Sequence, residues 1–148
     1  MKTNIIVTGH GNYGTGVESS IKLLSGHNER VEFIDFLEED TDDTLKDKIV
    51  NSLVNNEADQ NLFICDILGG TPFKVCVELS YEKENMEVVA GCNIGAILEG
   101  ILLKDSMGIV ELADSVVNAT KDTAVRFTKV NIATNSADNN GSTMDDGI

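Results

Sequence analysis

The sequence predicts an α/β domain built around a mostly parallel β-sheet. Short segments rich in β-branched residues alternate with segments whose apolar residues recur at helical spacing. Glycine-rich turns follow two of the expected strands, at residues 9–14 and 69–70. Strands that alternate with helices are connected by right-handed crossovers, and this connection favours parallel pairing.

The first strand is expected over residues 4–8, where an apolar run ends in glycine. The following helix is expected over residues 13–24, because its apolar residues lie at helical spacing and Gly26 provides a stop. Residues 30–36 are typical of a second strand. Thr41 is then expected to be the N-cap of a second helix, whose acidic first turn suits the helix dipole.

The third strand is expected over residues 61–66, a short apolar run that ends in an acidic residue. Gly69 and Gly70 follow it, and Thr71 is expected to be the N-cap of the next helix. Pro72 then falls at the first helical position, where a missing N–H has no cost.

The second half of the chain continues the alternation. A strand is expected over residues 87–90, helices over residues 94–103 and 108–120, and a short antiparallel strand over residues 123–130. Residues 131–148 are rich in Asn, Asp, Ser and Gly and predict a disordered tail or linker, which leaves residues 1–130 as one domain.

These elements predict a doubly wound, flavodoxin-like sheet with strand order 2-1-3-4. In that order the turns after the first and third strands are neighbours at the topological switch point, where open α/β sheets bind ligands. The prediction therefore brings together His10, which lies between Gly9 and Gly11, and Asp66.

This pairing predicts phosphoryl transfer through a phosphohistidine. A carboxylate such as Asp66 can fix the tautomer of His10 and leave its other ring nitrogen free to attack phosphorus. Backbone N–H groups of a glycine turn at a helix N-terminus suit the phosphoryl oxygens. His10 and Asp66 are the expected catalytic residues, and the expected phosphate-binding residues are Gly11, Gly69, Gly70 and Thr71.

Composition narrows the possible partners. The chain of 148 residues carries 25 acidic and 11 basic residues, a net charge of −14, which argues against nucleic acids and anionic membranes. No apolar run approaches the roughly 20 residues of a membrane span, and a cytoplasmic location is expected. Cys65, Cys76 and Cys92 have no metal-ligand spacing and are expected to be buried thiols, so neither a metal nor a cofactor is expected.

The motifs resemble those of a known family. Gly9-His10-Gly11 after the first strand, Asp66 followed by Gly-Gly-Thr-Pro-Phe, and residues 89–94 resemble the IIA components of the mannose-type bacterial sugar phosphotransferase systems. The resemblance spans about residues 2–130.

The resemblance implies that His10 is phosphorylated by the phosphocarrier protein HPr and passes the group to a histidine of the IIB component. The group then reaches a sugar that enters through the membrane pair IIC and IID. The resemblance also implies that Asp66 orients His10, that Gly70 and Thr71 belong to the phosphate-binding turn, and that a homodimer exchanges the strand of residues 123–130.

Several alternatives stay open at this point. The sugar is open among mannose, fructose, sorbose, N-acetylgalactosamine and gluconate, because Leu68, Thr71 and Gly95 depart from residues found in the family. A regulatory module would use the same phosphorylation site as a transport component. The glycines of residues 9–14, with Asp35 at the end of the second strand, also fit a dinucleotide-binding fingerprint. A receiver domain with Asp66 as acceptor is disfavoured, because no acidic pair follows the first strand.

Overall fold

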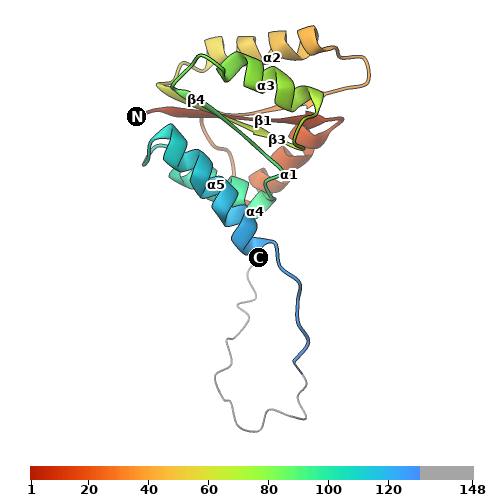
Figure 1. The fold of residues 1–148 in the computed structure, drawn as a ribbon, viewed down its shortest axis with the longest axis vertical. Helices are drawn as coiled ribbons and strands as arrows, with labels where there is room; N and C mark the ends of the chain where they lie inside the picture. The colour runs from red at the N-terminus through yellow and green to blue at the C-terminus, as the bar shows by residue number, and fades with distance from the viewer. Residues whose placement is uncertain (131–148) are drawn as a thin grey trace.

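A parallel sheet of four strands in the order β2-β1-β3-β4 forms the centre of the fold. The structure is a computed structural model that describes residues 1–130 (Figure 1). The strands are β1 (Thr3–His10), β2 (Val31–Phe36), β3 (Gln60–Cys65) and β4 (Met86–Ala90). The helices within the described residues are α1 (Tyr13–Ser25), α2 (Asp42–Asn55), α3 (Thr71–Ser80), α4 (Ile94–Leu103) and α5 (Ile109–Thr123). Both the fold class and the strand order are those that the sequence predicts.

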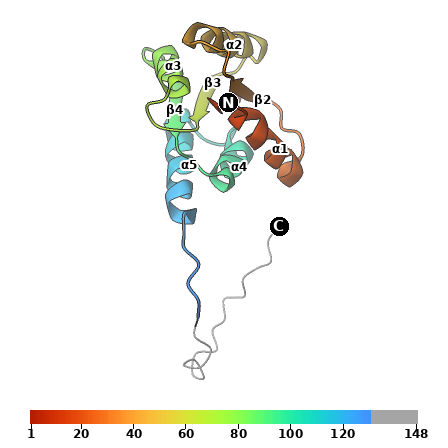
Figure 2. The ribbon, with the colours of Figure 1, turned by 90° about the vertical axis from the view of Figure 1, so that its right-hand side faces the viewer.

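Helices cover both faces of the sheet, as Figures 1 and 2 show: α2 and α3 lie on one face, and α1, α4 and α5 lie on the other. Side chains alternate between these faces along the central strands. Ile5 and Val7 of β1 pack toward α1, α4 and α5, whereas Ile6 between them packs toward α2 and α3. The central strands are therefore buried on both sides, which explains their apolar runs at residues 5–7 and 62–65.

The register of the central pair fixes where the two strands end. Thr8 of β1 lies opposite Cys65, the last residue of β3. One further ladder hydrogen bond, from the Asp66 N–H to the Thr8 carbonyl oxygen at 3.2 Å, extends the pairing past β3. The residues that follow both strands therefore emerge side by side at the carboxyl edge of the sheet.

The two predicted helix caps have different outcomes. Thr41 is the N-cap of α2, and its hydroxyl accepts from the Thr44 N–H at 3.2 Å in a capping box, as predicted. The prediction that Thr71 is the N-cap of α3 is wrong, because α3 already includes Thr71 and its N-cap is Gly70. The Gly70 carbonyl oxygen accepts the first helical hydrogen bond, from the Lys74 N–H at 3.0 Å. Extended backbone at Gly70, with φ −72° and ψ 170°, allows this early start.

The short antiparallel strand predicted over residues 123–130 is not formed in this single chain. Helix α5 continues to Thr123, and residues 124–130 then run away from the domain without joining a sheet (Figures 1 and 2). A strand needs a neighbouring backbone to complete its hydrogen bonds, and this segment reaches none. The predicted tail, residues 131–148, lies outside the described residues. Among the described helices, none is long and apolar enough to cross a bilayer.

Candidate active site

His10 and Asp66 meet at the carboxyl edge of the sheet. His10 is the last residue of β1, and Asp66 follows β3 directly. The Asp66 carboxylate oxygen Oδ2 accepts two hydrogen bonds from His10, one from the ring Nδ1 at 2.7 Å and one from the backbone N–H at 2.9 Å. The strand order predicted from the sequence implies this juxtaposition.

The surroundings of Asp66 keep its carboxylate ionised. The Asp66 side chain is only 12% exposed, and this burial by itself would raise its pKa. The backbone and ring N–H groups of His10, and the Ile67 N–H that donates to Oδ1 at 2.9 Å, stabilise the charged form. These hydrogen bonds prevail, so the pKa of Asp66 lies below its usual value.

The ionised carboxylate determines which nitrogen of His10 is free. A carboxylate can only accept, so Nδ1 carries the hydrogen in this pair and Nε2 of the neutral ring has the lone pair. The His10 side chain is 45% exposed. The site therefore combines a half-exposed imidazole with a bound Nδ1, so Nε2 is the nitrogen available as a nucleophile.

Two further groups confine the His10 ring. Phe36, at the end of β2, packs against it edge-on, with ring centroids 5.8 Å apart and an interplanar angle of 77°. Gly70 lies on another side, where a Cβ atom would come within 2.7 Å of Cε1 and 3.4 Å of Nε2. Only a residue without a side chain fits there without moving the ring, which gives the second glycine of the turn a physical role.

Gly9 permits a second close approach, directly before the histidine. A Cβ atom on Gly9 would lie 2.5 Å from Cδ1 of Tyr13 and 2.7 Å from Cβ of Asp66. Tyr13 and Asp66 therefore both pack onto bare backbone at the end of β1. Burial, reinforced by the negative charge of Asp66, raises the pKa of Tyr13 to about 12. Tyr13 and Phe36 are the site residues that sequence reasoning missed.

The open side of His10 faces a hollow of about 450 Å³. We call it the His10 hollow; the residues that line it are His10, Gly11, Phe36, Leu37, Glu38 and Asp40. The β3–α3 loop, which does not line this hollow, exposes Leu68 and is turned by Gly69, whose φ is 80°. Of the residues predicted to bind phosphate, Gly70 touches the ring and Gly11 lines the hollow, whereas Gly69 and Thr71 flank Gly70 in the chain.

The other candidate residues lie outside this chemistry. Both carboxylate oxygens of Asp35 are bound by Thr15, from its N–H at 2.9 Å and its hydroxyl at 2.7 Å, so Asp35 anchors α1. The three cysteines are buried free thiols, as predicted. No group of metal-ligating side chains occurs within residues 1–130.

A family model described as "PTS system fructose IIA component" matches residues 4–117, which include both turns of the site. The chain belongs to the EIIA-man family. Its membership makes it a component of a sugar phosphotransferase system with a phosphoryl-carrier role, in agreement with the sequence prediction.

Curated relatives of the EIIA-man chain carry different sugar names. It is 25% identical over 114 residues to the fructose-specific EIIA component of Bacillus subtilis, covering 76% of this chain and 78% of that protein. It is 25% identical over 118 residues to the sorbose-specific EIIA component of Lacticaseibacillus casei, covering 80% of this chain and 86% of that protein. The mannose-specific EIIAB component of Escherichia coli is 30% identical over 106 residues, 71% of this chain but 33% of that longer protein.

Solved structures agree with this assignment. A phosphotransferase system component EIIA from Streptococcus agalactiae superposes with a TM-score of 0.78 at 28% identity, covering 84% of this chain and 96% of that one. A mannose/sorbose specific IIA subunit from Enterococcus faecalis has the same fold, with a TM-score of 0.80 at 20% identity over 89% of this chain and 99% of that one.

Proposed function

We propose that His10 accepts a phosphoryl group from HPr on Nε2 and passes it to a histidine of the IIB component. The observation that carries this proposal is the 2.7 Å contact between Nδ1 of His10 and Asp66, which leaves Nε2 as the free ring nitrogen of a half-exposed side chain. The proposed setting is the cytoplasm, and the membrane components IIC and IID take part only indirectly.

In the proposed transfer, the Nε2 lone pair of His10 attacks the phosphorus of phosphorylated HPr. The N–P bond in HPr breaks as the new N–P bond forms, and the electron pair of the broken bond returns to the HPr histidine. Positive charge that develops on the His10 ring is stabilised by Asp66 through Nδ1. In the transfer to IIB these roles are reversed: the IIB histidine attacks phosphorus, and Nε2 of His10 is the leaving group.

The phosphoryl oxygens are proposed to lie against the turn that begins α3. Gly70 borders the ring at Cε1, the atom next to Nε2, and the first N–H groups of α3 follow it without intrahelical partners. Thr71 at the first helical position offers a hydroxyl, and the proposed cradle also includes Gly11 and Gly69. No metal or cofactor is proposed for this step.

Phosphorylation by the phosphotransferase components tests the proposal. The full chain is mixed with phosphoenolpyruvate, enzyme I and HPr, and intact mass is measured for one added phosphoryl group. We expect an acid-labile, alkali-stable modification that is lost in His10→Ala. His27→Ala is the matched control, because His27 is exposed and is the one other histidine of the sequence. Label that remains in His10→Ala would overturn the proposal.

A homodimer is also proposed, with residues 124–130 exchanged between subunits. This segment exposes Val125, Phe127 and Val130 by 64% to 81%, and β4 has an unpaired edge at the end of the sheet. An extended apolar segment and an open strand edge fit one another as a new antiparallel pair. Truncation after Thr123 is expected to give a monomer by light scattering, and truncation after Val130 a dimer; a monomeric full chain would contradict the exchange.

A further inference from the structure

Acidic residues gather at the carboxyl edge of the sheet, most of them in the turn and first helical turn after β2. Residues 37–45 and 66–74 contain six Asp or Glu, and residues 9–16 and 91–97 contain none. The His10 hollow itself is lined by Glu38 and Asp40. A phosphoryl group on His10 adds negative charge to this edge, where like charges repel it.

One basic residue, Lys74, belongs to these turns or to the first helical turns that follow them. Residues 9–16, 37–45, 66–74 and 91–97 contain no other Lys or Arg. Lys48 reaches the same edge from α2, but its ammonium is held by Asp40 at 2.7 Å. Lys46 is likewise paired with Glu78 at 3.1 Å. Lys74 is exposed and forms no ion pair within the described residues 1–130.

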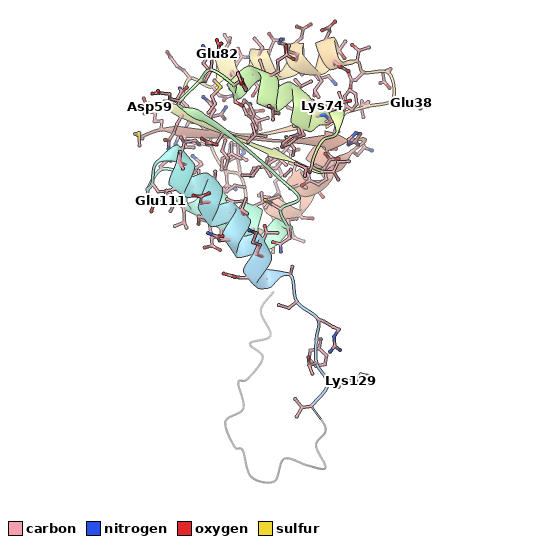
Figure 3. All side chains as sticks on the ribbon, viewed as in Figure 1. Glu38, Asp59, Lys74, Glu82, Glu111 and Lys129 are labelled. Carbon is pink, nitrogen blue, oxygen red and sulfur yellow. The ribbon has the colours of Figure 1, made fainter. Side chains whose placement is uncertain are left out.

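The position of Lys74 on α3 directs it toward the phosphorylation site. Its N–H donates to the carbonyl oxygen of Gly70, the residue that touches the His10 ring. Lys74 therefore lies one turn after Gly70. Helical side chains lean toward the helix N-terminus, so the lysine stem extends back over this first turn. Figure 3 shows Lys74 at the end of α3 that the β3–α3 loop enters.

We propose that Lys74 is the counter-charge for the phosphoryl group carried on His10. This inference rests on the proposed function of His10 and adds to it a cationic phosphate-binding residue. The positive charge of the Lys74 ammonium group offsets the negative charge of this edge, so it stabilises phosphate oxygens bound beside Nε2. Lys74 makes no contact with Asp66 or with the ring in this proposal, and its role is confined to the anion.

The first test uses inorganic phosphate and needs no carrier protein. Phosphate is titrated into the unphosphorylated full chain while the His10 ring signals are followed by NMR. We expect saturable shifts in the wild type and a dissociation constant about 5-fold weaker in Lys74→Gln. Lys83→Gln, which removes the same charge just past the far end of α3, should match the wild type, and Lys74→Arg should stay within about 2-fold of it.

Salt separates this electrostatic role from a structural one. The difference between wild type and Lys74→Gln should shrink as ionic strength rises, because salt screens exposed charges. Equal phosphate affinity in the wild type and Lys74→Gln at low salt would overturn the proposal, and so would a wild type that shows no saturable shift.

The carrier reaction then distinguishes this inference from the proposed function. The equilibrium constant for phosphoryl transfer from phosphorylated HPr should be about 5-fold lower for Lys74→Gln than for the wild type, the same factor as in the phosphate titration. If HPr fails to label the wild type, the proposed function is wrong, while the phosphate titration still decides the role of Lys74. If labelling is normal and equal in both proteins, only the role of Lys74 is refuted.

Discussion

Gly70→Ala tests whether the place of the His10 ring controls phosphoryl transfer. The new methyl group would lie 2.7 Å from Cε1, so the ring has to retreat by roughly 0.7 Å to reach ordinary van der Waals contact near 3.4 Å. A displacement of that size stretches or bends the hydrogen bond of 2.7 Å between Nδ1 and Asp66. The backbone needs no change, because φ −72° and ψ 170° suit alanine.

The expected loss follows from that hydrogen bond. Hydrogen bonds to charged groups are worth about 1.5–3 kcal/mol, which corresponds to roughly 10- to 150-fold in rate. A misplacement of about 1 Å in a reacting group has a similar cost. We therefore expect Gly70→Ala to take up phosphoryl group from HPr roughly 10- to 100-fold more slowly, and its free energy of unfolding to change by about 1 kcal/mol or less.

The assay combines rapid-quench phosphorylation with NMR of the His10 ring and urea unfolding. Gly16→Ala is the matched control, because a Cβ atom at Gly16 meets nothing within 4 Å and the residue lies inside α1. It should phosphorylate at the wild-type rate and gain up to about 1 kcal/mol in stability. A Gly70→Ala protein with the wild-type rate and unshifted ring signals would refute the reasoning.

Three further substitutions probe the surroundings of the site. Asp66→Asn should slow phosphorylation at least 10-fold, roughly the value of a charged hydrogen bond. The folded pKa of Asp66 is below its usual value, so the ionised carboxylate stabilises the wild type above about pH 4, and this contribution is lost as pH falls through the folded pKa. Urea unfolding from pH 2 to 6 should show this pH dependence in the wild type and not in Asp66→Asn. Tyr13→Phe should remove a loss of stability that the wild type shows as pH rises from about 10 toward the folded pKa of about 12, a difference visible in alkaline urea unfolding. Gly100→Ala should destabilise by about 1–3 kcal/mol, because its Cβ would lie 2.6 Å from Val116, while the folded protein keeps its phosphorylation rate; unchanged unfolding would contradict that packing.

Strand order and the meeting of His10 with Asp66 could be predicted because each depends on a pattern along the chain. Alternating strands and helices limit the topology, and the topology brings the two glycine-rich turns together. The confinement of the ring could not be predicted. Phe36 contacts His10 only because β2 and β1 end at the same level, with Phe36 opposite His10 in the register.

The start of α3 and the end of the chain show two other limits of the sequence. Thr71 is a residue type typical of an N-cap, but α3 begins one residue earlier than predicted and has Gly70 as its N-cap. Residues 124–130 alternate like a strand, but alternation does not supply the backbone with which a strand pairs. Local preference therefore does not fix the exact start of a helix, and it does not form a strand without a neighbouring backbone.

The hydrogen bond from the Asp66 N–H to the Thr8 carbonyl oxygen has a consequence for how the protein loses activity. The bond lies beyond the last residue of β3, so deuterium exchange of the Asp66 amide should report the opening of this edge of the sheet. Opening there would separate Asp66 from His10 while the core of the sheet stays folded. Mild heating should therefore lower the rate of phosphorylation before the whole domain unfolds.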